Sequence, residues 1–167
     1  NVGKFIALEI APLTKALDKK PPRLIEGEVQ SSAEMERFFD GFKEMGLYGL
    51  NLPRELGGLN VPMTLYYSLA ELIGRADISV LGHYGFHGGI AMTLLTYAIK
   101  EGSIEHEGEV ITKTRFDQAI QEIAEGNAFG CMVLTEPDAG SDLSAIRTKA
   151  VLGEDGRWRL SGQKIFI

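Results

Sequence analysis

A long run without a charged side chain constrains the fold more than any other feature of this sequence. Residues 78–99 contain no Lys, Arg, Asp or Glu. A membrane span needs about 18 such residues, but this run also holds two histidines, four glycines and several hydroxyl side chains. We therefore expect no membrane span, but a helix that is apolar on most faces and lies at the centre of a helical domain.

The segments around this run also predict helices. Apolar residues recur at helical spacing in four further segments, residues 5–17, 35–45, 65–73 and 116–123. Pro12 predicts a kink in the first of these. Ser31 and Glu34 have the spacing of a capping box before the second, and Gly46 is placed to end that helix. Pro62 suits the first turn of the third helix.

The hydrophobic period changes near residue 128. The short apolar stretch 128–134 has the composition of a buried strand, and "GEDG" predicts a hairpin turn between "IRTKAVL" and "RWRLS". The closing "QKIFI" predicts one more strand. The single cysteine, Cys131, excludes an internal disulfide, and its apolar surroundings favour a buried side chain over a nucleophile.

The sequence therefore predicts a mainly α fold with two domains. An all-helical N-terminal domain covers residues 1–127, and residues 128–167 form the first strands of a β-barrel or β-sandwich domain. Because the chain begins without Met and stops inside an apolar strand, we expect a fragment of a longer protein. A net charge of −6 argues against nucleic acid as a partner, and the acidic stretch 105–110 predicts a solvated loop.

The loop "TEPDAGSD", residues 135–142, has the chemistry of a ligand cradle. Thr135 leaves the end of the predicted strand and can donate one hydrogen bond. Gly140 permits close backbone approach, and Ser141 offers a hydroxyl and an N–H, so the bend suits a phosphate. We expect Asp142 to cap the next turn or to bond back into the loop, and Glu136 to be a structural acceptor rather than a base. A capped loop between two strands remains the alternative.

Several motifs together resemble the acyl-CoA dehydrogenase family. "VLTEPDAGSDLSAIRTKA" and "LSGQKIFI" are similar to the family's first signature and the strand after it. "EIAPL", "MGLYGLNLPRELGGLNVP" and "LAELIGRADISV" resemble its helical N-terminal domain, in the expected order. The resemblance covers nearly the whole chain, apart from residues 103–126, which look longer than the family's usual linker.

This resemblance implies a flavoenzyme that binds FAD. Thr135 would hydrogen-bond the flavin ring near N5, and Gly140 and Ser141 would lie at the pyrophosphate, with Ser141 also touching acyl-CoA. The aromatic Phe166 falls where the family places a ring against the flavin. The cofactor-binding positions implied are Met132, Leu134, Thr135, Gly140, Ser141 and Phe166. Gly82, Gly85 and Gly88 fall where the family's acyl pocket is lined, so the resemblance implies that they line it. Close packing between helices is the alternative, and we prefer it.

The implied activity is oxidation of an acyl-CoA thioester to trans-2-enoyl-CoA, as in fatty acid β-oxidation, with FAD as hydride acceptor. In this family the catalytic glutamate belongs to a later helical domain, so we expect no catalytic residue in this chain and an inactive fragment. The implied partners are an electron-transfer flavoprotein or another acceptor and further copies of the chain. The implied location is the cytoplasm, or the mitochondrial matrix in a eukaryote.

Other interpretations remain open at this point. The same scaffold could serve an acyl-CoA oxidase or a flavin monooxygenase, in which the reduced flavin meets oxygen. A non-catalytic helical interaction domain without cofactor is a further alternative. His83 and His87 have a spacing that can bind metal, but no carboxylate completes the set, so we predict no metal site.

Overall fold

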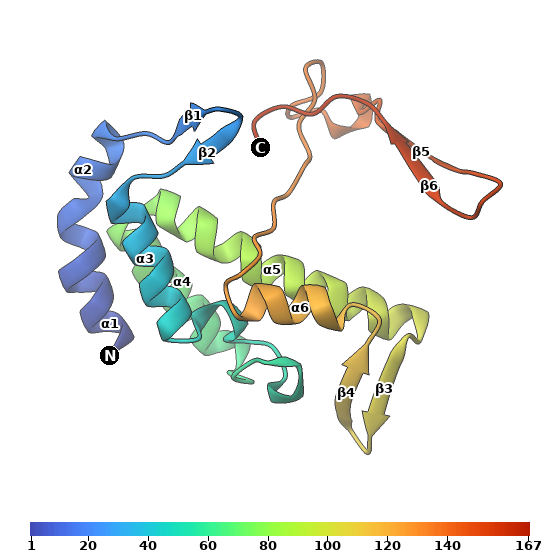
Figure 1. Cartoon of the computed structure of the whole chain (residues 1–167), viewed down its shortest axis with the longest axis horizontal. Coiled ribbons are helices and arrows are strands. Elements are labelled where there is room, and N and C mark those ends of the chain that lie inside the picture. The colour runs from blue at the N-terminus through green and yellow to red at the C-terminus, as the bar shows by residue number, and fades with distance from the viewer. The chain divides into compact units, whose positions relative to one another are not determined.

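The structure is a computed structural model that describes all 167 residues. The chain divides into two compact units, Asn1–Gly130 and Cys131–Ile167. The first unit is mainly helical, and the second contains one β-hairpin and irregular loops (Figure 1). The predicted fold class, helical first and then the start of a β domain, is confirmed. That residues 1–127 and 128–167 are separate folding domains stays a prediction.

The chain begins with one helical rod that changes its winding at Pro12. Helix α1 (Val2–Phe5) runs into a π-helical turn (Ile6–Ile10), a 3₁₀ turn (Ala11–Leu13) and helix α2 (Thr14–Lys19). Proline has no N–H to donate, and its ring collides with the carbonyl four residues earlier in a regular α-helix. The π-helical turn before Pro12 and the 3₁₀ turn around it avoid this collision, so the proline does not end the helix.

The N-cap of helix α3 (Ala33–Glu44) is Ser32, one residue later than the predicted cap Ser31. The hydroxyl of Ser32 accepts a hydrogen bond of 3.2 Å from the N–H of Met35, so the capping box predicted from Ser31 and Glu34 is wrong. Glu34 instead forms an ion pair with Lys20. Gly46 ends the helix as predicted, in the left-handed conformation at φ 67° that glycine adopts without strain.

The segment between α3 and the next helix is more buried than a surface loop. It contains 3₁₀ turns at Leu47–Gly49 and Arg54–Leu56 and folds back on itself. The N–H of Asn60 donates to the carbonyl of Leu52 at 2.8 Å. At Gly58, a Cβ atom would lie 2.1 Å from that same carbonyl oxygen, so the backbone approach requires glycine.

Helices α4 (Met63–Ala76) and α5 (Ile78–Glu101) pack against each other, and Pro62 precedes α4 as its N-cap. Along α4, Leu69 and Ile73 are buried, but Leu65 and Leu72 of the same predicted apolar segment are exposed. Tyr66 takes the third buried position of this helix. None of the helices has the length and hydrophobicity that crossing a membrane would require.

Helix α5 lies at the centre of the first unit, as predicted (Figure 1). Its Val80 and Tyr84 belong to a core shared with α3 and α4, and its Ala91 and Leu95 belong to a second core under helix α6 (Asp117–Ala124). Helix α6 follows the predicted pattern and ends at a left-handed Gly126. One helix thus supplies side chains to both cores, which ties the helical unit together.

Two short hairpins extend from the helical unit. Strands β1 (Arg23–Ile25) and β2 (Glu28–Gln30) form the first, which the sequence did not indicate. Strands β3 (Ile104–Glu107) and β4 (Val110–Thr114) form the second, so the loop predicted at 105–110 is wrong, although its side chains are exposed. The strands of the first hairpin have no buried face, so the hydrophobic alternation that identifies strands is missing there.

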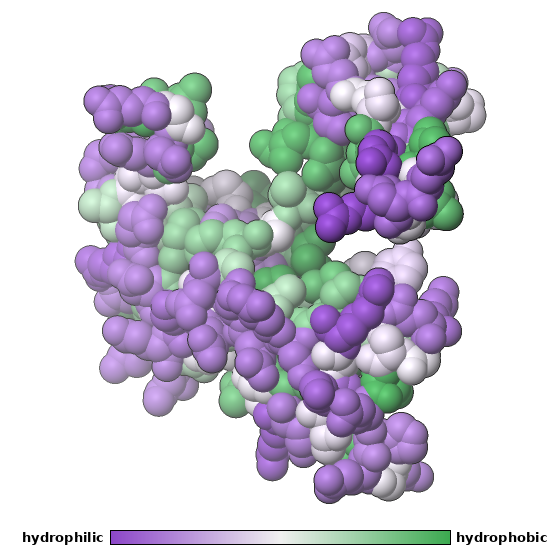
Figure 2. Space-filling model, turned by 45° about the vertical axis from the view of Figure 1, so that its right-hand side comes forward, coloured by the Kyte–Doolittle hydropathy of each residue, from purple (hydrophilic) through white to green (hydrophobic).

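The second unit contains the hairpin predicted around "GEDG". Strands β5 (Lys149–Leu152) and β6 (Trp158–Ser161) pair antiparallel, with Leu152 opposite Trp158. The strands predicted at 128–134 and 163–167 are wrong, because neither segment finds a ladder partner. Cys131 is exposed rather than buried, and Trp158 and Leu160 are exposed too. Figure 2 shows hydrophobic residues, in green, on the surface among hydrophilic residues, in purple.

The backbone approach at Gly58 gives a stability test on the 167-residue chain. We expect Gly58→Ala to lower the free energy of unfolding by about 1–3 kcal/mol, because the new methyl group collides with the Leu52 carbonyl. The control is Gly82→Ala within α5, where a Cβ meets open space and alanine should raise stability by about 0.5–1 kcal/mol. Urea unfolding followed by circular dichroism measures both, and equal effects would contradict the packing described here.

Candidate functional site

The predicted cradle begins with a closed turn. The N–H of Glu136 donates to the carbonyl of Ala139 at 3.0 Å, and the N–H of Ala139 donates back to the carbonyl of Glu136 at 3.1 Å. Pro137 occupies the second position of this turn, where its fixed φ is favourable. Because Ala139 is buried, the turn is anchored at the point from which Gly140 and Ser141 extend.

Glu136 is a structural acceptor, as predicted. Its buried carboxylate accepts hydrogen bonds from the N–H of Arg147 at 2.7 Å, the N–H of Thr148 at 3.0 Å and the ammonium of Lys164 at 2.9 Å. The Thr148 hydroxyl, the Arg147 amide and Lys164 lower the pKa of Glu136 to about 2. A carboxylate this acidic and this fully bonded is a poor general base, so its role is to hold the loop.

Lys164 also joins the loop to the last residues of the chain. Its ammonium donates to the carbonyl of Leu134 at 2.9 Å, and the next N–H, that of Ile165, donates to the carbonyl of Thr135 at 3.0 Å. Phe166 follows with a left-handed φ of 57° and is 89% exposed. Tertiary contacts thus bring Leu134, Thr135 and the Phe166 segment together, although 163–167 forms no strand.

Gly140 and Ser141 keep their hydrogen-bonding groups free. Both residues are exposed, and their N–H groups donate to no acceptor in the chain. A Cβ built on Gly140 meets no atom within 4 Å, so the space beside the backbone is open. Asp142 caps the following 3₁₀ turn (Leu143–Ala145) by accepting from the Ser144 N–H at 3.0 Å. The cap leaves the donors of Gly140 and Ser141 available to an anionic group.

The residues before the turn present apolar surface. Met132 is 56% exposed and Leu134 is 38% exposed, while Thr135 is partly buried. Exposed apolar side chains next to a hydroxyl and free N–H groups fit a ligand with a flat ring and a phosphate. The donor set of residues 132–141 therefore fits FAD, the cofactor that the sequence implied.

A second group of ring side chains lies in the helical unit around His87. The ring of Phe129 stacks on His87 with centroids 4.4 Å apart, and Phe39 stacks on His83 at 3.7 Å. The Nδ1 atom of His87 accepts a hydrogen bond of 3.1 Å from the N–H of Gly130. Burial lowers the pKa values of His83 and His87 to about 4. The sequence identified the two histidines but gave no sign of their contact with 129–130.

Of the three glycines of α5, only Gly88 takes part in the helix packing that the sequence favoured. A Cβ on Gly82 or Gly85 would meet no atom within 4 Å, and only Gly88 lies close to a neighbour, Tyr66. The space beside Gly82 and Gly85 is open in this chain, which leaves the pocket-lining alternative as a prediction.

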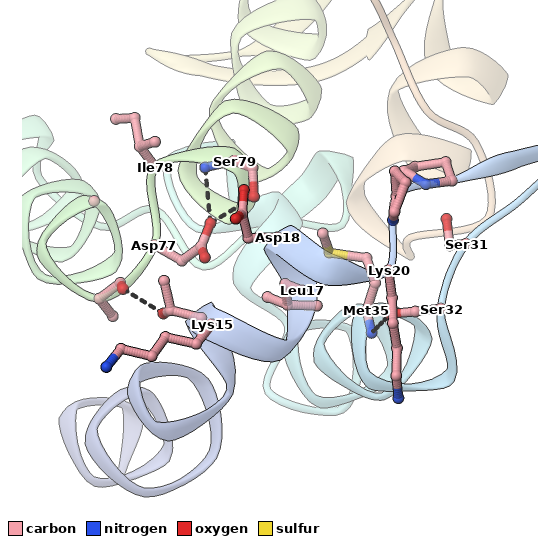
Figure 3. Close-up of a pocket in the computed structure, with 15 residues that line it drawn as sticks. Lys15, Leu17, Asp18, Lys20, Ser31, Ser32, Met35, Asp77, Ile78 and Ser79 are labelled. Carbon is pink, nitrogen blue, oxygen red and sulfur yellow. Dashed lines mark hydrogen bonds between the residues drawn. The ribbon is translucent and has the colours of Figure 1, made fainter.

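A cavity of about 690 Å³ lies elsewhere in the helical unit, between the end of α2, the start of α3 and the α4–α5 junction. Figure 3 shows Asp77 and Ser79 on one side of it and Lys20, Ser32 and Met35 on the other. Asp77 and Ser32 cap helices and Lys20 pairs with Glu34, so these polar groups already serve the fold. None of the predicted site residues lines this cavity.

The chain matches two family models over most of its length. Residues 1–102 match the N-terminal domain of acyl-CoA dehydrogenase, and residues 131–167 match its middle domain. The chain therefore belongs to the acyl-CoA dehydrogenase family. Residues 103–130, which hold the β3–β4 hairpin and α6, lie outside both matches, in the region where the sequence departs from the family pattern.

Individual relatives agree with this assignment. A 3-methylmercaptopropionyl-CoA dehydrogenase from Ruegeria pomeroyi is 34% identical over 99% of this chain and 26% of its own length. A mitochondrial very long-chain specific acyl-CoA dehydrogenase from Rattus norvegicus is 36% identical over 79% of this chain and 18% of its own length. An acyl-CoA dehydrogenase from Bacillus anthracis, solved in complex with FAD, shares the fold, with a TM-score of 0.66 and 23% identity over 98% of this chain and 24% of that one. The chain thus spans a minor part of each relative.

The bonds of Glu136 give a testable pH dependence. Its folded pKa of about 2 lies below the ordinary 4.5, so its stabilising contribution is complete above pH 4.5 and is lost as the pH falls through 2. We expect Glu136→Gln to remove this dependence and to lower the hydrogen-exchange protection of the Arg147 and Thr148 amides at neutral pH. Asp138→Asn, which alters only an exposed ion pair with Arg147, is the matched control. Unchanged amide protection in Glu136→Gln would contradict this role.

Proposed function

We propose that the whole protein is an FAD-dependent acyl-CoA dehydrogenase that oxidises an acyl-CoA thioester to trans-2-enoyl-CoA. The observation that carries this proposal is the pair of free backbone donors at Gly140 and Ser141, held by the Glu136–Lys164 bonds beside exposed apolar side chains. Family membership supports the reaction class, and the names of the relatives agree on CoA thioesters that differ in their acyl group.

In this proposal each residue binds or orients rather than reacts. Met132, Leu134 and Phe166 would cover the flavin ring and exclude water, and the Thr135 hydroxyl would donate a hydrogen bond to the ring. The N–H groups of Gly140 and Ser141 and the Ser141 hydroxyl would bind the pyrophosphate, and Ser141 would also contact acyl-CoA. The chemistry that FAD would supply is acceptance of a hydride from the acyl β-carbon.

The α-proton requires a base that these residues do not supply. Glu136 is excluded because its pKa is about 2 and its oxygens are occupied by three donors. We place the base in the family's later helical domain. We also propose an electron-transfer flavoprotein or another acceptor as redox partner, a homo-oligomer as the assembly, a part in fatty acid β-oxidation, and a cytoplasmic or mitochondrial matrix location.

Substitutions in the cradle test cofactor binding in the whole protein. We expect Thr135→Ala and Ser141→Ala each to weaken FAD retention by about tenfold, the effect of one lost hydrogen bond, and to slow flavin reduction. Gly140→Val should leave the fold stable, because its Cβ meets open space, but should block the phosphate. Ser144→Ala, in the same loop but bonded to Asp142, is the control. The FAD content of each variant is measured by absorbance. FAD retention at the parent level in all three variants would contradict the proposed role of residues 135–141 in binding FAD.

The reaction with oxygen distinguishes a dehydrogenase from an oxidase or a monooxygenase on the same scaffold. The whole protein is reduced anaerobically with an acyl-CoA and then mixed with oxygenated buffer in a stopped-flow instrument. We expect flavin bleaching on reduction and slow reoxidation, because a dehydrogenase shields its reduced flavin from oxygen. Rapid reoxidation with release of peroxide would replace the dehydrogenase assignment by an oxidase. A protein that cannot be loaded with FAD would favour a non-catalytic role.

A further inference from the structure

We infer that His87 is a positioning residue for the cofactor. Its neutral imidazole accepts a hydrogen bond from the N–H of Gly130, which we call the anchor, and protonation of the ring at low pH breaks this hydrogen bond. Gly130 leads directly into Cys131 and the Met132–Thr135 positions that the proposed function assigns to the flavin. The inference therefore rests on the proposed function for its effect on FAD. The anchor itself can be measured without any cofactor.

The hydrogen bond fixes the proton on one side of the His87 ring. Because the N–H of Gly130 donates to Nδ1 at 3.1 Å, Nδ1 carries no proton in the folded unit. The Nε2 atom therefore carries the ring proton, and it lies 3.0 Å from Nδ1 of His83. Only 3% of the His87 surface is exposed, so water does not compete for the Gly130 donor.

The chain is pressed against α5 at two consecutive residues, 129 and 130. The Phe129 ring stacks on His87 at an interplanar angle of 27°. A Cβ on Gly130 would lie 2.5 Å from Cγ1 of Ile90, so only glycine allows the backbone this close to the helix. His87 and Ile90 come from the same side of α5, one turn apart. Together they hold Phe129 and Gly130 against α5.

The neighbours of His87 keep its ring neutral. The titratable side chains that face it are His83, from α5 itself, and Tyr48, from the 3₁₀ turn, whose ring centroid is 5.5 Å away. Burial raises the pKa of Tyr48, and the carboxylates of Asp40 and Glu36 on α3 raise it further. No carboxylate contributes to the pKa of either histidine. Burial lowers both pKa values to about 4, and at His87 it outweighs the backbone of Gly130, which acts to raise the pKa.

The pH dependence follows from this arrangement. Once released to water, His87 regains an ordinary pKa of about 6.5. The released form therefore binds protons that the anchored form does not, and the anchor weakens as the pH falls from 6.5 toward 4. A protonated His87 carries an N–H at Nδ1 that faces the Gly130 N–H, so the bond cannot persist. When Gly130 is released from His87, residues 131–135 gain conformational entropy that FAD binding must remove.

Two variants separate the anchor from general packing. In His87→Asn the Oδ1 atom keeps an acceptor near the position of Nδ1 but cannot titrate. In His87→Leu the side chain fills the space with no acceptor. We measure the FAD dissociation constant of the whole protein at pH 7.5 and pH 5.0 by flavin fluorescence. The parent should bind about tenfold more weakly at pH 5.0, His87→Asn should bind equally at both, and His87→Leu should bind about tenfold more weakly at both.

The second measurement uses the 167-residue chain without FAD. In ¹H–¹⁵N spectra, the Gly130 amide of the parent should be protected from exchange at pH 7.5 and should lose protection by pH 5.0. In His87→Asn this protection should persist at both values. Loss of protection on acidification in His87→Asn would overturn the inference, because nothing at residue 87 titrates there. The His87→Asn variant therefore tests the role of His87 even if His87→Leu does not fold.

The outcomes for the inference and for the proposed function are distinct. Parent-like FAD affinity in a folded His87→Leu variant would overturn the positioning role while the cofactor assignment stands. A parent protein that binds no FAD would overturn the proposed function and with it the positioning role. In that case a pH-dependent Gly130 amide would still support the anchor, and an amide unprotected at pH 7.5 would refute it.

Discussion

The burial of α5 is the constraint on which the helical unit depends. A helix with no charged side chain between residues 78 and 99 gains stability only when other elements cover it. Its Val80 and Tyr84 enter one core and its Ala91 and Leu95 the other, so α3, α4 and α6 are all oriented by this helix. The same helix carries His87, which connects the helical core to the end of the unit at Gly130.

The fold of the second unit depends on charge-assisted hydrogen bonds rather than on a hydrophobic core. Its β5–β6 hairpin exposes apolar side chains such as Trp158 and Leu160, so hydrophobic burial contributes little there. The buried Glu136 carboxylate instead gathers donors from Arg147, Thr148 and Lys164. Charge-assisted bonds of this kind are about twice as strong as neutral ones. They give the loop a defined shape without using the donors of Gly140 and Ser141, which remain free for a ligand.

The errors of the sequence-based description have distinct physical causes. The stretch 128–134 is apolar enough for a strand, but a strand also needs a neighbour to complete its hydrogen bonds, and composition does not reveal whether one is present. The β1–β2 hairpin was missed for the opposite reason, since it forms without a buried face. Cys131 was expected to be buried because its neighbours are apolar, yet those neighbours are themselves exposed.

The sequence by itself determined the helices of the first unit, the hairpin at "GEDG", the family, and the chemistry of the 135–142 loop. These follow from local patterns, because helix periodicity, turn residues and caps involve groups within a few residues of one another. Only the tertiary structure decided that Lys164 bonds Glu136, 28 residues away, and that Gly130 donates to His87, 43 residues away. Such contacts depend on how distant segments pack, and no local pattern records which donor reaches which acceptor.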